Sequence, residues 1–376
     1  MRLFGFDDRG LPPSMKVLIL SNQELSDIYA KWKAEGEQAR AEHLWGATTL
    51  GKYGIEVDIL PYQKFGLLKL MSKVNVLGDL DQQLRVLLSA SKYDAIYSAH
   101  HLTTPLLALL RKLKLLKTPL VAIAYQSFVP GWVSRLFTAL CVDGNDRIIC
   151  LNPQLKADLI HEFHLSEAKL SVAEWGVDLP FYEAIATHQA SAVATDASAP
   201  PLILSTGKTY RDYATLLKGI ESLNCQLKIC CFDIESVKTG LSLPANAHFY
   251  EGILPWRAVL QEYRKAYAVA IPLGNYPQKP NNAVGLTVLL EAIALGKPVV
   301  MTRNNLSRYV MDIEAAGIGL WVDAGDVKGW QAALGYLLDH PAEAAMMGQR
   351  ARQLAEQELN LEVFSAKVAA VLQPFG

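Results

Sequence analysis

Cysteine is scarce in this chain and never occurs in a metal-binding or redox pattern. Among 376 residues there are five cysteines, with no Cys-x-x-Cys pair and no spacing typical of zinc sites. An odd number of thiols on largely apolar sequence is typical of reduced, buried cysteines in a cytosolic protein. We therefore expect no disulfide framework and a cytoplasmic location.

Long hydrophobic runs are also absent. No stretch reaches the roughly 18 consecutive apolar residues expected of a membrane-spanning helix. The first residues include Arg2, Asp7 and Arg9 before Pro12, whereas a signal peptide needs an unbroken apolar core. The sequence predicts neither a spanning helix nor a signal peptide, so any membrane contact would be peripheral and on the cytoplasmic face.

Several signatures of cofactor and nucleophile chemistry are missing. Ser21-Asn22-Gln23 follows the first predicted strand, where a Gly-x-Gly-x-x-Gly loop would indicate a nicotinamide dehydrogenase. There is no Walker loop and no Gly-x-Ser-x-Gly turn. The acidic pair Asp79 and Asp81 falls at a predicted helix start, and not in a loop that could hold a metal across a diphosphate. We expect no metal and no separate cofactor.

The composition is that of an ordinary, somewhat apolar globular protein. Hydrophobic residues make up 51% and charged residues 19%, and the length allows two domains with separate cores. The net charge of −1 provides no field that would attract nucleic acid. Predicted strands alternate with predicted helices throughout, which indicates α/β layers around parallel sheets. The strands are expected near residues 16–21, 55–60, 93–98, 120–124, 147–151, 202–205, 227–232, 247–250, 267–271, 297–302 and 318–322.

A shift in composition divides the chain. Residues 186–200 are small and polar without periodicity, so we interpret them as an interdomain linker. Residues 1–185 then form the first domain and residues 201–355 the second. The helical residues 356–376 are expected to pack back on the first domain.

A single charge interrupts the most apolar predicted helix. Residues 285–296 contain one charged residue, Glu291, and Gly296 is a natural helix stop. A buried carboxylate is costly unless hydrogen-bond donors satisfy it. The hydroxyl groups of a bound ribose could be those donors, and a neighbouring Arg or Lys is the alternative.

A basic turn elsewhere suits a diphosphate. Lys208 and Arg211 follow a predicted strand and Gly207, and each cation could give a charge-assisted hydrogen bond to a phosphate. A pair of surface cations without a ligand is the alternative.

The loop that precedes the helix of Glu291 offers further polar contacts. The side chain of Asn282 and the backbone from Gly285 to Thr287 could contact phosphates and a transferred sugar, because the first N–H groups of a helix have no partner within it. Ordinary helix capping by Asn281 or Asn282 is the alternative.

These segments together resemble the donor site of the family 4 glycosyltransferases, which are retaining enzymes with the GT-B fold. The sequence Gly285-Leu-Thr-Val-Leu-Leu-Glu291-Ala-Ile-Ala-Leu-Gly296-Lys-Pro-Val is similar to the second half of the family's donor-helix motif. The first Glu of that motif, which touches the transferred sugar in the family, would fall at Ala283, so the chain departs from the pattern there. Further similar segments lie at residues 165–178, 205–217, 319–326 and 347–352.

The resemblance implies two Rossmann-like doubly wound domains facing across a cleft, with the acceptor bound by the first and the nucleotide sugar by the second. It implies transfer of a sugar from a UDP- or GDP-linked donor to a hydroxyl acceptor, with retention and without a metal. Glu291 would bind the ribose, Lys208 and Arg211 the diphosphate, and the backbone at 252–254 the base. The predicted donor-site residues are Gly207, Lys208, Arg211, Gly252, Ile253, Leu254, Asn282, Gly285, Leu286, Thr287 and Glu291.

The acceptor side departs from the family. Many members have a His after the strand that corresponds to residues 120–124, where this chain has Tyr125. His100 and His101 instead end the preceding strand, at the edge where open α/β sheets place functional groups. We name His101 as the acceptor-side candidate, with a loop or helix-cap histidine as the alternative.

Two questions of partner and activity stay open at this stage. The acceptor could be a glycan, a lipid-linked compound or a small molecule. Arg111, Lys112, Lys114 and Lys117 mark a basic, leucine-rich helix end that could contact an anionic membrane, and leucines packed on the sheet are the alternative. Rival functions are a sugar-nucleotide epimerase or hydrolase on the same fold and a non-catalytic sugar-nucleotide binder.

Overall fold

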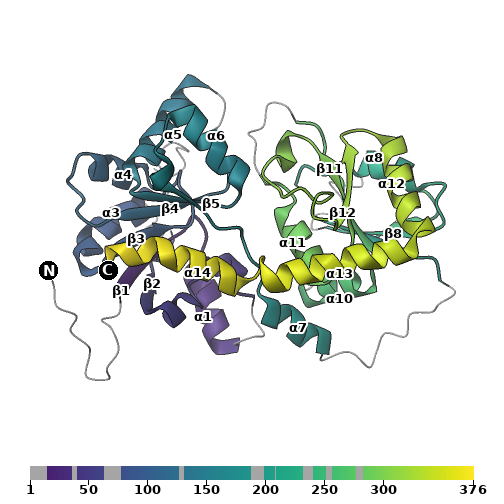
Figure 1. Cartoon of the computed structure of the whole chain (residues 1–376), viewed down its shortest axis with the longest axis horizontal. Coiled ribbons are helices and arrows are strands. Elements are labelled where there is room, and N and C mark those ends of the chain that lie inside the picture. The colour runs from purple at the N-terminus through teal and green to yellow at the C-terminus, as the bar shows by residue number, and fades with distance from the viewer. Residues whose placement is uncertain are drawn as a thin grey trace. The chain divides into compact units, whose positions relative to one another are not determined.

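The structure is a computed structural model that describes residues 15–35, 40–62, 78–126, 131–187, 199–207, 209–231, 240–250, 256–276 and 283–376. The chain forms two compact units, one of Met1–Asp178 together with Leu361–Gly376 and one of Leu179–Asn360. Figure 1 labels their helices and strands. The α/β class that the alternating pattern predicts is confirmed.

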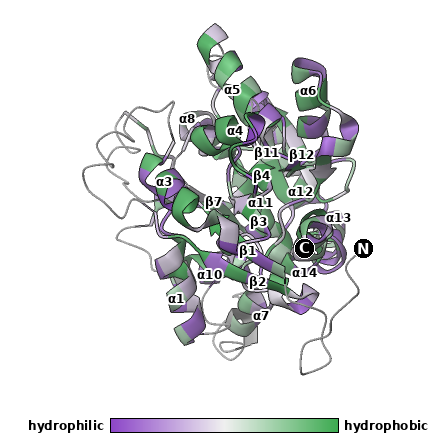
Figure 2. Ribbon diagram, turned by 90° about the vertical axis from the view of Figure 1, so that its left-hand side faces the viewer, coloured by the Kyte–Doolittle hydropathy of each residue, from purple (hydrophilic) through white to green (hydrophobic). Residues whose placement is uncertain are grey.

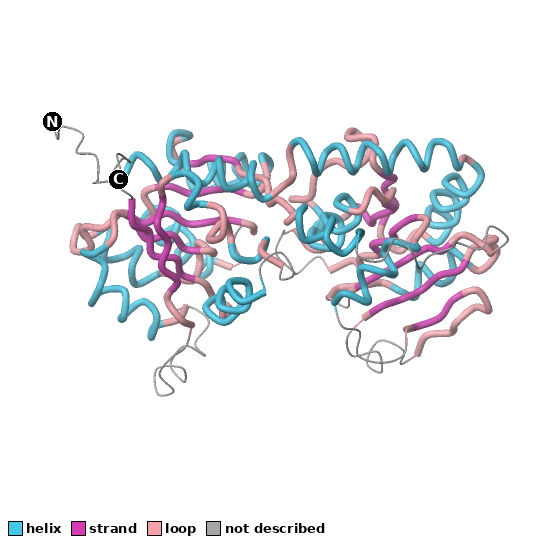
Figure 3. Tube along the Cα trace, turned by 90° about the horizontal axis from the view of Figure 1, so that it is seen from below, coloured by secondary structure: helices cyan, strands magenta, loops and turns pink. Residues whose placement is uncertain are grey.

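A six-stranded parallel sheet forms the centre of the first unit, in the order β2-β1-β3-β4-β5-β6. Helices lie on both faces of the sheet (Figure 3), so its inner strands are buried on both sides and consist of continuous apolar runs. The strands are β1 (Met15–Leu20), β2 (Ile55–Ile59), β3 (Ala95–Ser98), β4 (Leu120–Ala124), β5 (Arg147–Cys150) and β6 (Leu170–Val172). The α-helices are α1 (Leu25–Glu35), α3 (Leu80–Ser89), α4 (Pro105–Lys112), α5 (Trp132–Gly144), α6 (Pro153–Phe163) and α14 (Leu361–Leu372), with 3-10 turns η2 (Glu42–Leu44), η3 (Leu50–Tyr53), η4 (Ala90–Lys92), η5 (Glu167–Lys169) and η7 (Gln373–Phe375).

The second unit repeats this plan with the strand order β12-β11-β10-β7-β8-β9. Trp330 and Leu334 of α12 pack on one face of the sheet, against Leu227 and Ala270. The strands are β7 (Leu202–Thr206), β8 (Gln226–Cys230), β9 (Ala247–Phe249), β10 (Ala268–Ile271), β11 (Val299–Arg303) and β12 (Gly319–Asp323). The helices are α7 (Leu179–Thr187), α8 (Tyr213–Ile220), α10 (Trp256–Lys265), α11 (Leu286–Ala294), α12 (Val327–Asp339) and α13 (Pro341–Gln357), with the 3-10 turn η6 (Asn305–Ser307).

Both sheets reverse their strand order beside their first strand. In the first unit β2 lies on one side of β1 and β3 on the other, and in the second unit β8 and β10 flank β7 in the same way. The loops that leave such a pair of strands diverge to opposite faces and open a crevice at the carboxyl ends, where α/β proteins bind ligands. The topology therefore predicts a ligand-binding edge in each unit, one after β1 and β3 and the other after β7 and β10.

Local sequence signals explain several helix ends. Asn152 caps α6 by accepting from the backbone N–H of Gln154 at 2.7 Å, and Pro153 occupies the first turn. Asp79 caps α3 through the N–H of Gln82, as its predicted place at a helix start requires. Gly296 has a φ of +64°, the left-handed geometry that glycine adopts readily after a helix.

The C-terminal helix α14 belongs to the first unit. The backbone N–H of Leu361 donates to the carbonyl of Val177 at 2.9 Å, and the hydroxyl of Ser365 pairs with that of Thr49. Residues 179–185, which the composition assigns to the first domain, cluster with the second unit. Most of the expected linker, residues 188–198, lies outside the described residues.

Within the described part of the chain, no helix is both long enough and apolar enough to cross a bilayer.

Candidate functional site

The loop after β7 is tied to the loop after β10, at the carboxyl edge where the second sheet reverses its order. Arg211 forms an isolated antiparallel bridge with Leu273. The backbone N–H of Asp212 donates to the carbonyl of Pro272 at 3.1 Å, and that of Gly274 donates to Tyr210 at 2.9 Å. These bonds hold residues 209–212 over the crevice between the two strands.

Arg211 folds back over the end of β7. Its Nε donates to the carbonyl of Thr206 and its Nη1 to that of Thr209, both at 3.1 Å. Gly207 has a φ of +88°, and a Cβ built on it would lie 2.9 Å from Nη2 of Arg211. Glycine at this position therefore allows the guanidinium group to approach the backbone.

The electrostatic surroundings of Arg211 mix burial with polar neighbours. Burial lowers the pKa of Arg211, while Tyr213, Tyr263 and Glu291 act in the opposite direction. A guanidinium group stays protonated in proteins, so the crevice keeps a positive charge. A half-buried cation fixed by two backbone carbonyls is a suitable partner for a phosphate group.

Glu291 lies in the buried middle of α11. It is 2% exposed, and every residue from Val288 to Ala294 is buried. The hydroxyl group of Tyr263 on α10 hydrogen-bonds to the Glu291 side chain, and the charge of Arg211 acts on it. The carboxylate thus has partners within the polypeptide. One of them is Arg211, the kind of neighbouring cation that the sequence analysis gives as the alternative to a ribose.

The N-terminus of α11 points its first turn at the same edge of the sheet. Gly285 precedes the helix with a φ of +88° and caps it without a side chain. A Cβ at Gly285 would lie 2.9 Å from Cε of Met301 and 3.1 Å from Cγ2 of Ile271, so the backbone packs directly on the ends of β11 and β10. Leu286 donates its N–H to Ala283, whereas the helix provides no partner for that of Thr287. Such N–H groups attract anions.

Five of the predicted donor-site residues lie outside the described residues. They are Lys208, Gly252, Ile253, Leu254 and Asn282. The other six lie in the second unit, where Gly207 and Arg211 follow β7 and Gly285, Leu286, Thr287 and Glu291 belong to the start and middle of α11.

The corresponding edge of the first unit holds the two histidines. His101 is fully buried, its backbone N–H donates to Ile123 at 2.8 Å, and neither ring nitrogen has a hydrogen-bond partner among the described residues. Burial lowers the pKa of His101 to about 4, so the ring is neutral at physiological pH. His100 accepts from the N–H of Leu102 through Nδ1, and burial lowers its pKa well below the usual value.

A cluster of aromatic side chains extends from His100. The ring of Tyr125 packs edge-on against His100 at 4.4 Å and lies parallel to the ring of Trp45 at 6.4 Å. Trp45 also stacks on Trp175 at 5.1 Å. Tyr125 further hydrogen-bonds to Asn22, which follows β1. The loops after β1, β3 and β4 therefore meet at one edge of the sheet. The strand order explains this meeting, whereas the spacing of these aromatic residues along the chain does not predict it.

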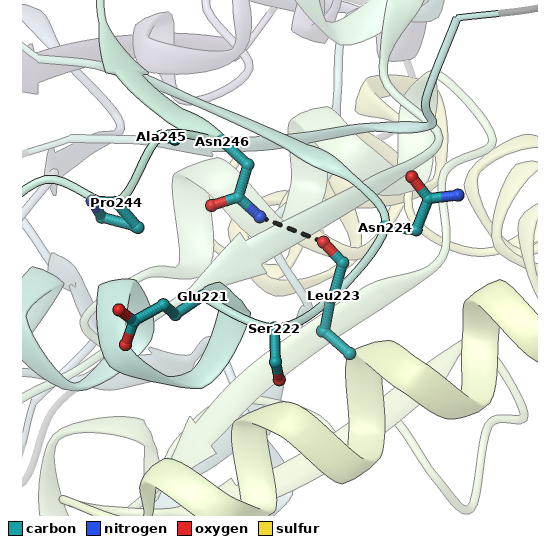
Figure 4. A pocket seen from close by; sticks show the side chains of 7 residues that line it. All are labelled: Glu221, Ser222, Leu223, Asn224, Pro244, Ala245 and Asn246. Carbon is teal, nitrogen blue, oxygen red and sulfur yellow. Dashed lines mark hydrogen bonds between the residues drawn. The ribbon is translucent and has the colours of Figure 1, made fainter.

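A pocket of about 400 Å³ lies elsewhere in the second unit (Figure 4). Its lining residues, 221–224 and 244–246, precede β8 and β9 and so belong to the amino edge of the sheet. Asn246 donates to the carbonyls of Ile220 and Leu223 at 2.9 and 3.1 Å, and Glu221 is the one charged residue in the lining. The pocket lacks the cations and helix N-terminus of the opposite edge, and we do not assign the donor site to it.

No group of three or more His, Cys, Asp or Glu side chains is placed to hold a metal ion among the described residues.

Comparison with known families and structures agrees with this architecture. Residues 48–181 match the family described as Glycosyltransferase Family 4, and residues 234–354 match Glycosyl transferases group 1. No curated protein matches the sequence.

Several solved structures have a similar fold. HepE of Anabaena in complex with UDP is 15% identical with a TM-score of 0.62, over 96% of this chain and 100% of that chain. Sucrose-phosphate synthase of Thermosynechococcus elongatus is 15% identical with a TM-score of 0.67, over 96% and 98%. A glycosyltransferase of Rickettsia africae is 12% identical with a TM-score of 0.65, over 96% and 98%. At these identities the likeness concerns the fold.

Proposed function

Since the chain is a group 1 glycosyltransferase of the family 4 type with the GT-B fold, we propose that it transfers a sugar from a nucleotide diphosphate sugar to a hydroxyl acceptor with retention of configuration. The observation that carries the proposal is the convergence of Arg211, Glu291 and the N-terminus of α11 at one edge of the second sheet. A UDP donor is favoured over GDP because HepE, which has a similar fold, was solved with UDP and with UDP-glucose.

Each part of this edge suits one part of the donor. Arg211, with Lys208 beside it in sequence, would hold the diphosphate, and the first N–H groups of α11 would add hydrogen bonds to the same oxygens. Glu291 would accept from the ribose hydroxyl groups. Gly252, Ile253 and Leu254 would contact the base and Asn282 the transferred sugar.

The proposed reaction exchanges one bond at the anomeric carbon for another. The bond to the oxygen of the β-phosphate breaks, and negative charge develops on that phosphate. Arg211 and the amides of α11 would stabilise this charge, which we take to be their main catalytic contribution. The acceptor hydroxyl bonds to the same face of the anomeric carbon, and its proton passes to the leaving phosphate. No metal is required by these steps.

Two positions set expectations for substrate selection. The carbonyl of Ala283 accepts a hydrogen bond from the N–H of Leu286, but its methyl side chain cannot bind the sugar as a carboxylate would. We therefore propose that backbone groups do more of the sugar recognition than in relatives that have a Glu here. His101 is proposed as the acceptor-side residue, acting as a neutral ring that can donate or accept a hydrogen bond.

A binding experiment tests the donor site. Titration calorimetry with UDP, GDP and ADP should show binding of one of them to the wild type, and Glu291→Gln should weaken it by about 1–3 kcal/mol, the range for a hydrogen bond to a charged group. Glu262→Gln is the matched control, because Glu262 is another buried acid of this unit but pairs with Lys228 at 2.7 Å. Failure of the wild type to bind any nucleotide would contradict the proposal.

Turnover separates the proposed transferase from its rivals. A transferase releases nucleoside diphosphate from the donor when an acceptor-containing extract is added. An epimerase or hydrolase converts the donor without the extract, and a non-catalytic binder releases nothing in either case.

We also propose that the first unit contacts an anionic membrane surface through α3, α4 and α5. Between Pro105 and Lys117 the chain has four cations and no acid, and Lys114 and Lys117 form no ion pair with a described residue. Figure 2 shows hydrophobic residues along α4 and α5. All nine exposed large hydrophobic residues described in this unit belong to these helices or the turn after α4: Leu84, Leu87, Leu88, Leu109, Leu113, Leu115, Trp132, Val133 and Leu136. Apolar side chains flanked by cations suit an anionic bilayer.

Vesicle sedimentation tests this surface. The wild type should sediment with vesicles that contain phosphatidylglycerol and less with pure phosphatidylcholine. The double variant Trp132→Ser/Leu136→Ser, which replaces side chains that are 75% and 62% exposed, should lose most of this binding. Met346→Ser, an exposed position on α13 of the second unit, is the control. Equal sedimentation of both variants would exclude the surface.

A further inference from the structure

Tyr263 connects the two ends of the proposed donor site. It lies on α10 and its side chain is completely buried. Burial raises the pKa of Tyr263, and the charge of the Glu291 side chain and a hydrogen bond to it add to the rise. On the other side, Oγ1 of Thr206 lies 2.9 Å from Oη of Tyr263. A tyrosine has one hydroxyl proton, so if it donates to the carboxylate, it must accept from Thr206.

Thr206 extends this arrangement to the cation. It is the last residue of β7, and its carbonyl oxygen accepts from Nε of Arg211 at 3.1 Å. The polar groups therefore run in sequence from Arg211 through Thr206 and Tyr263 to Glu291. Its two ends are the groups proposed to bind diphosphate and ribose.

We propose that Tyr263 is a positioning residue of the donor site, whose hydroxyl group holds the Glu291 carboxylate in the orientation that accepts from the ribose of a nucleoside diphosphate. The inference rests on the proposed function, since it assigns the ribose to Glu291. A carboxylate anchored by one hydrogen bond loses little further freedom when the ligand binds, which raises affinity. Burial, followed by the effect of Glu291, raises the pKa of Tyr263 well above its usual value, so the hydroxyl group keeps its proton at any working pH.

The test uses the nucleoside diphosphate that the wild type binds, UDP or GDP, together with its 2′,3′-dideoxy analogue. Tyr263→Phe removes one hydroxyl group and keeps the ring. We expect the variant to bind the ribose form about 5- to 30-fold more weakly, as for loss of a hydrogen bond near a charged group. Its affinity for the dideoxy form should change by less than about twofold, because that ligand lacks the hydroxyl groups that Glu291 would accept from.

Tyr267→Phe is the matched control. Tyr267 lies between α10 and β10, and its hydroxyl group donates to the carbonyl of Leu337, on α12. This variant also loses a tyrosine hydrogen bond in the same unit, so it reports the effect on stability alone. Its preference for the ribose form over the dideoxy form should equal that of the wild type.

The outcomes separate this inference from the proposed function. If the wild type binds no nucleotide, the proposed function fails, and this inference fails with it. If Glu291→Gln abolishes the ribose preference and Tyr263→Phe retains it, the donor site stands and Tyr263 has no positioning role. Tyr263 also has no positioning role if Tyr263→Phe weakens both ligands equally, because that result describes a structural residue. Loss of the preference in both Glu291→Gln and Tyr263→Phe supports the inference.

Discussion

At the scale of single residues, the proposed donor site depends on side chains that are absent as well as on those that are present. Gly207 lets the Arg211 guanidinium pass over the backbone, and Gly285 lets α11 start directly on the ends of β10 and β11. Both have positive φ, which other residues adopt at a cost. In each case the missing Cβ brings a positively charged or partly positive group closer to the crevice.

The variant Gly207→Ala should displace Arg211 without unfolding the protein. The new Cβ would lie 2.9 Å from Nη2 of Arg211, the mobile end of a long side chain, so the guanidinium group should move and the fold should persist. Isothermal titration should show nucleoside diphosphate binding weakened about tenfold, as for loss of a charge-assisted hydrogen bond.

Gly325→Ala provides the matched control for Gly207→Ala. Gly325 has a φ of +78°, and a Cβ there would have no neighbour within 4 Å. Alanine is strained at a positive φ, so thermal unfolding should show both variants destabilised by about 1–2 kcal/mol. The control should nevertheless bind nucleotide like the wild type. Equal affinities in the two variants would show that Arg211 does not need its present position.

At the scale of helices and strands, the sequence predicts what depends on neighbouring residues. The strand at 120–124, the cap formed by Asn152 and Pro153, and the helix end at Gly296 all follow from short-range patterns, and the structure confirms them. The carboxyl-edge location of His101 also follows, because it needs only a parallel strand and the residues after it.

Contacts between distant elements could not be predicted in the same way. Tyr263 and Tyr267 are only four residues apart, yet one hydroxyl group bonds to Glu291 and the other to Leu337. The local sequence does not identify either partner, since Glu291 belongs to α11 and Leu337 to α12. Trp45 likewise meets Tyr125 only because the loops after several strands converge at one edge. Strand order decides such pairs, and a single sequence does not specify it.

Helix packing gives a prediction at this scale, based on two glycines inside helices. A Cβ at Gly348 of α13 would lie 2.3 Å from the carbonyl oxygen of Gly296, just after α11, and backbone cannot move aside easily. Gly348→Ala should therefore destabilise the second unit by about 1–3 kcal/mol, as overpacking does. At Gly335 of α12 the nearest atom would be 3.7 Å away, so Gly335→Ala should stabilise by about 0.5–1 kcal/mol.

Chemical denaturation of the two variants checks the signs. The midpoint should fall for Gly348→Ala and rise for Gly335→Ala. A rise in both would mean that α13 can shift away from α11, and the close approach at Gly296 would then be no constraint on the end of α11.

At the scale of the whole molecule, the two units differ in how acid should affect them. His43, His100 and His101 of the first unit all have lowered pKa values because burial disfavours the charged ring, to about 3 for His43 and about 4 for His101. Among the histidines in the described part of the second unit, His248 alone has a lowered pKa, and its side chain is exposed. Sensitivity to mild acid is thus concentrated in the unit proposed to bind the acceptor.

The sign of the effect follows from proton linkage. Above pH 6.5 the His101 ring is neutral in both the folded and the unfolded chain, so it adds no pH dependence. Between pH 6.5 and about 4 the unfolded chain binds a proton that the folded chain does not, so stability falls as the pH falls. From pH 7.5 to 5 this one group should lower the free energy of unfolding by about 2 kcal/mol.

Hydrogen–deuterium exchange should therefore show the first unit losing protection at pH 5 before the second, and His101→Asn should reduce that pH dependence. If the second unit opened first, or if His101→Asn left the slope unchanged, the buried neutral ring could not be the cause, and the assignment of His101 as an uncharged acceptor-side residue would lose its electrostatic basis.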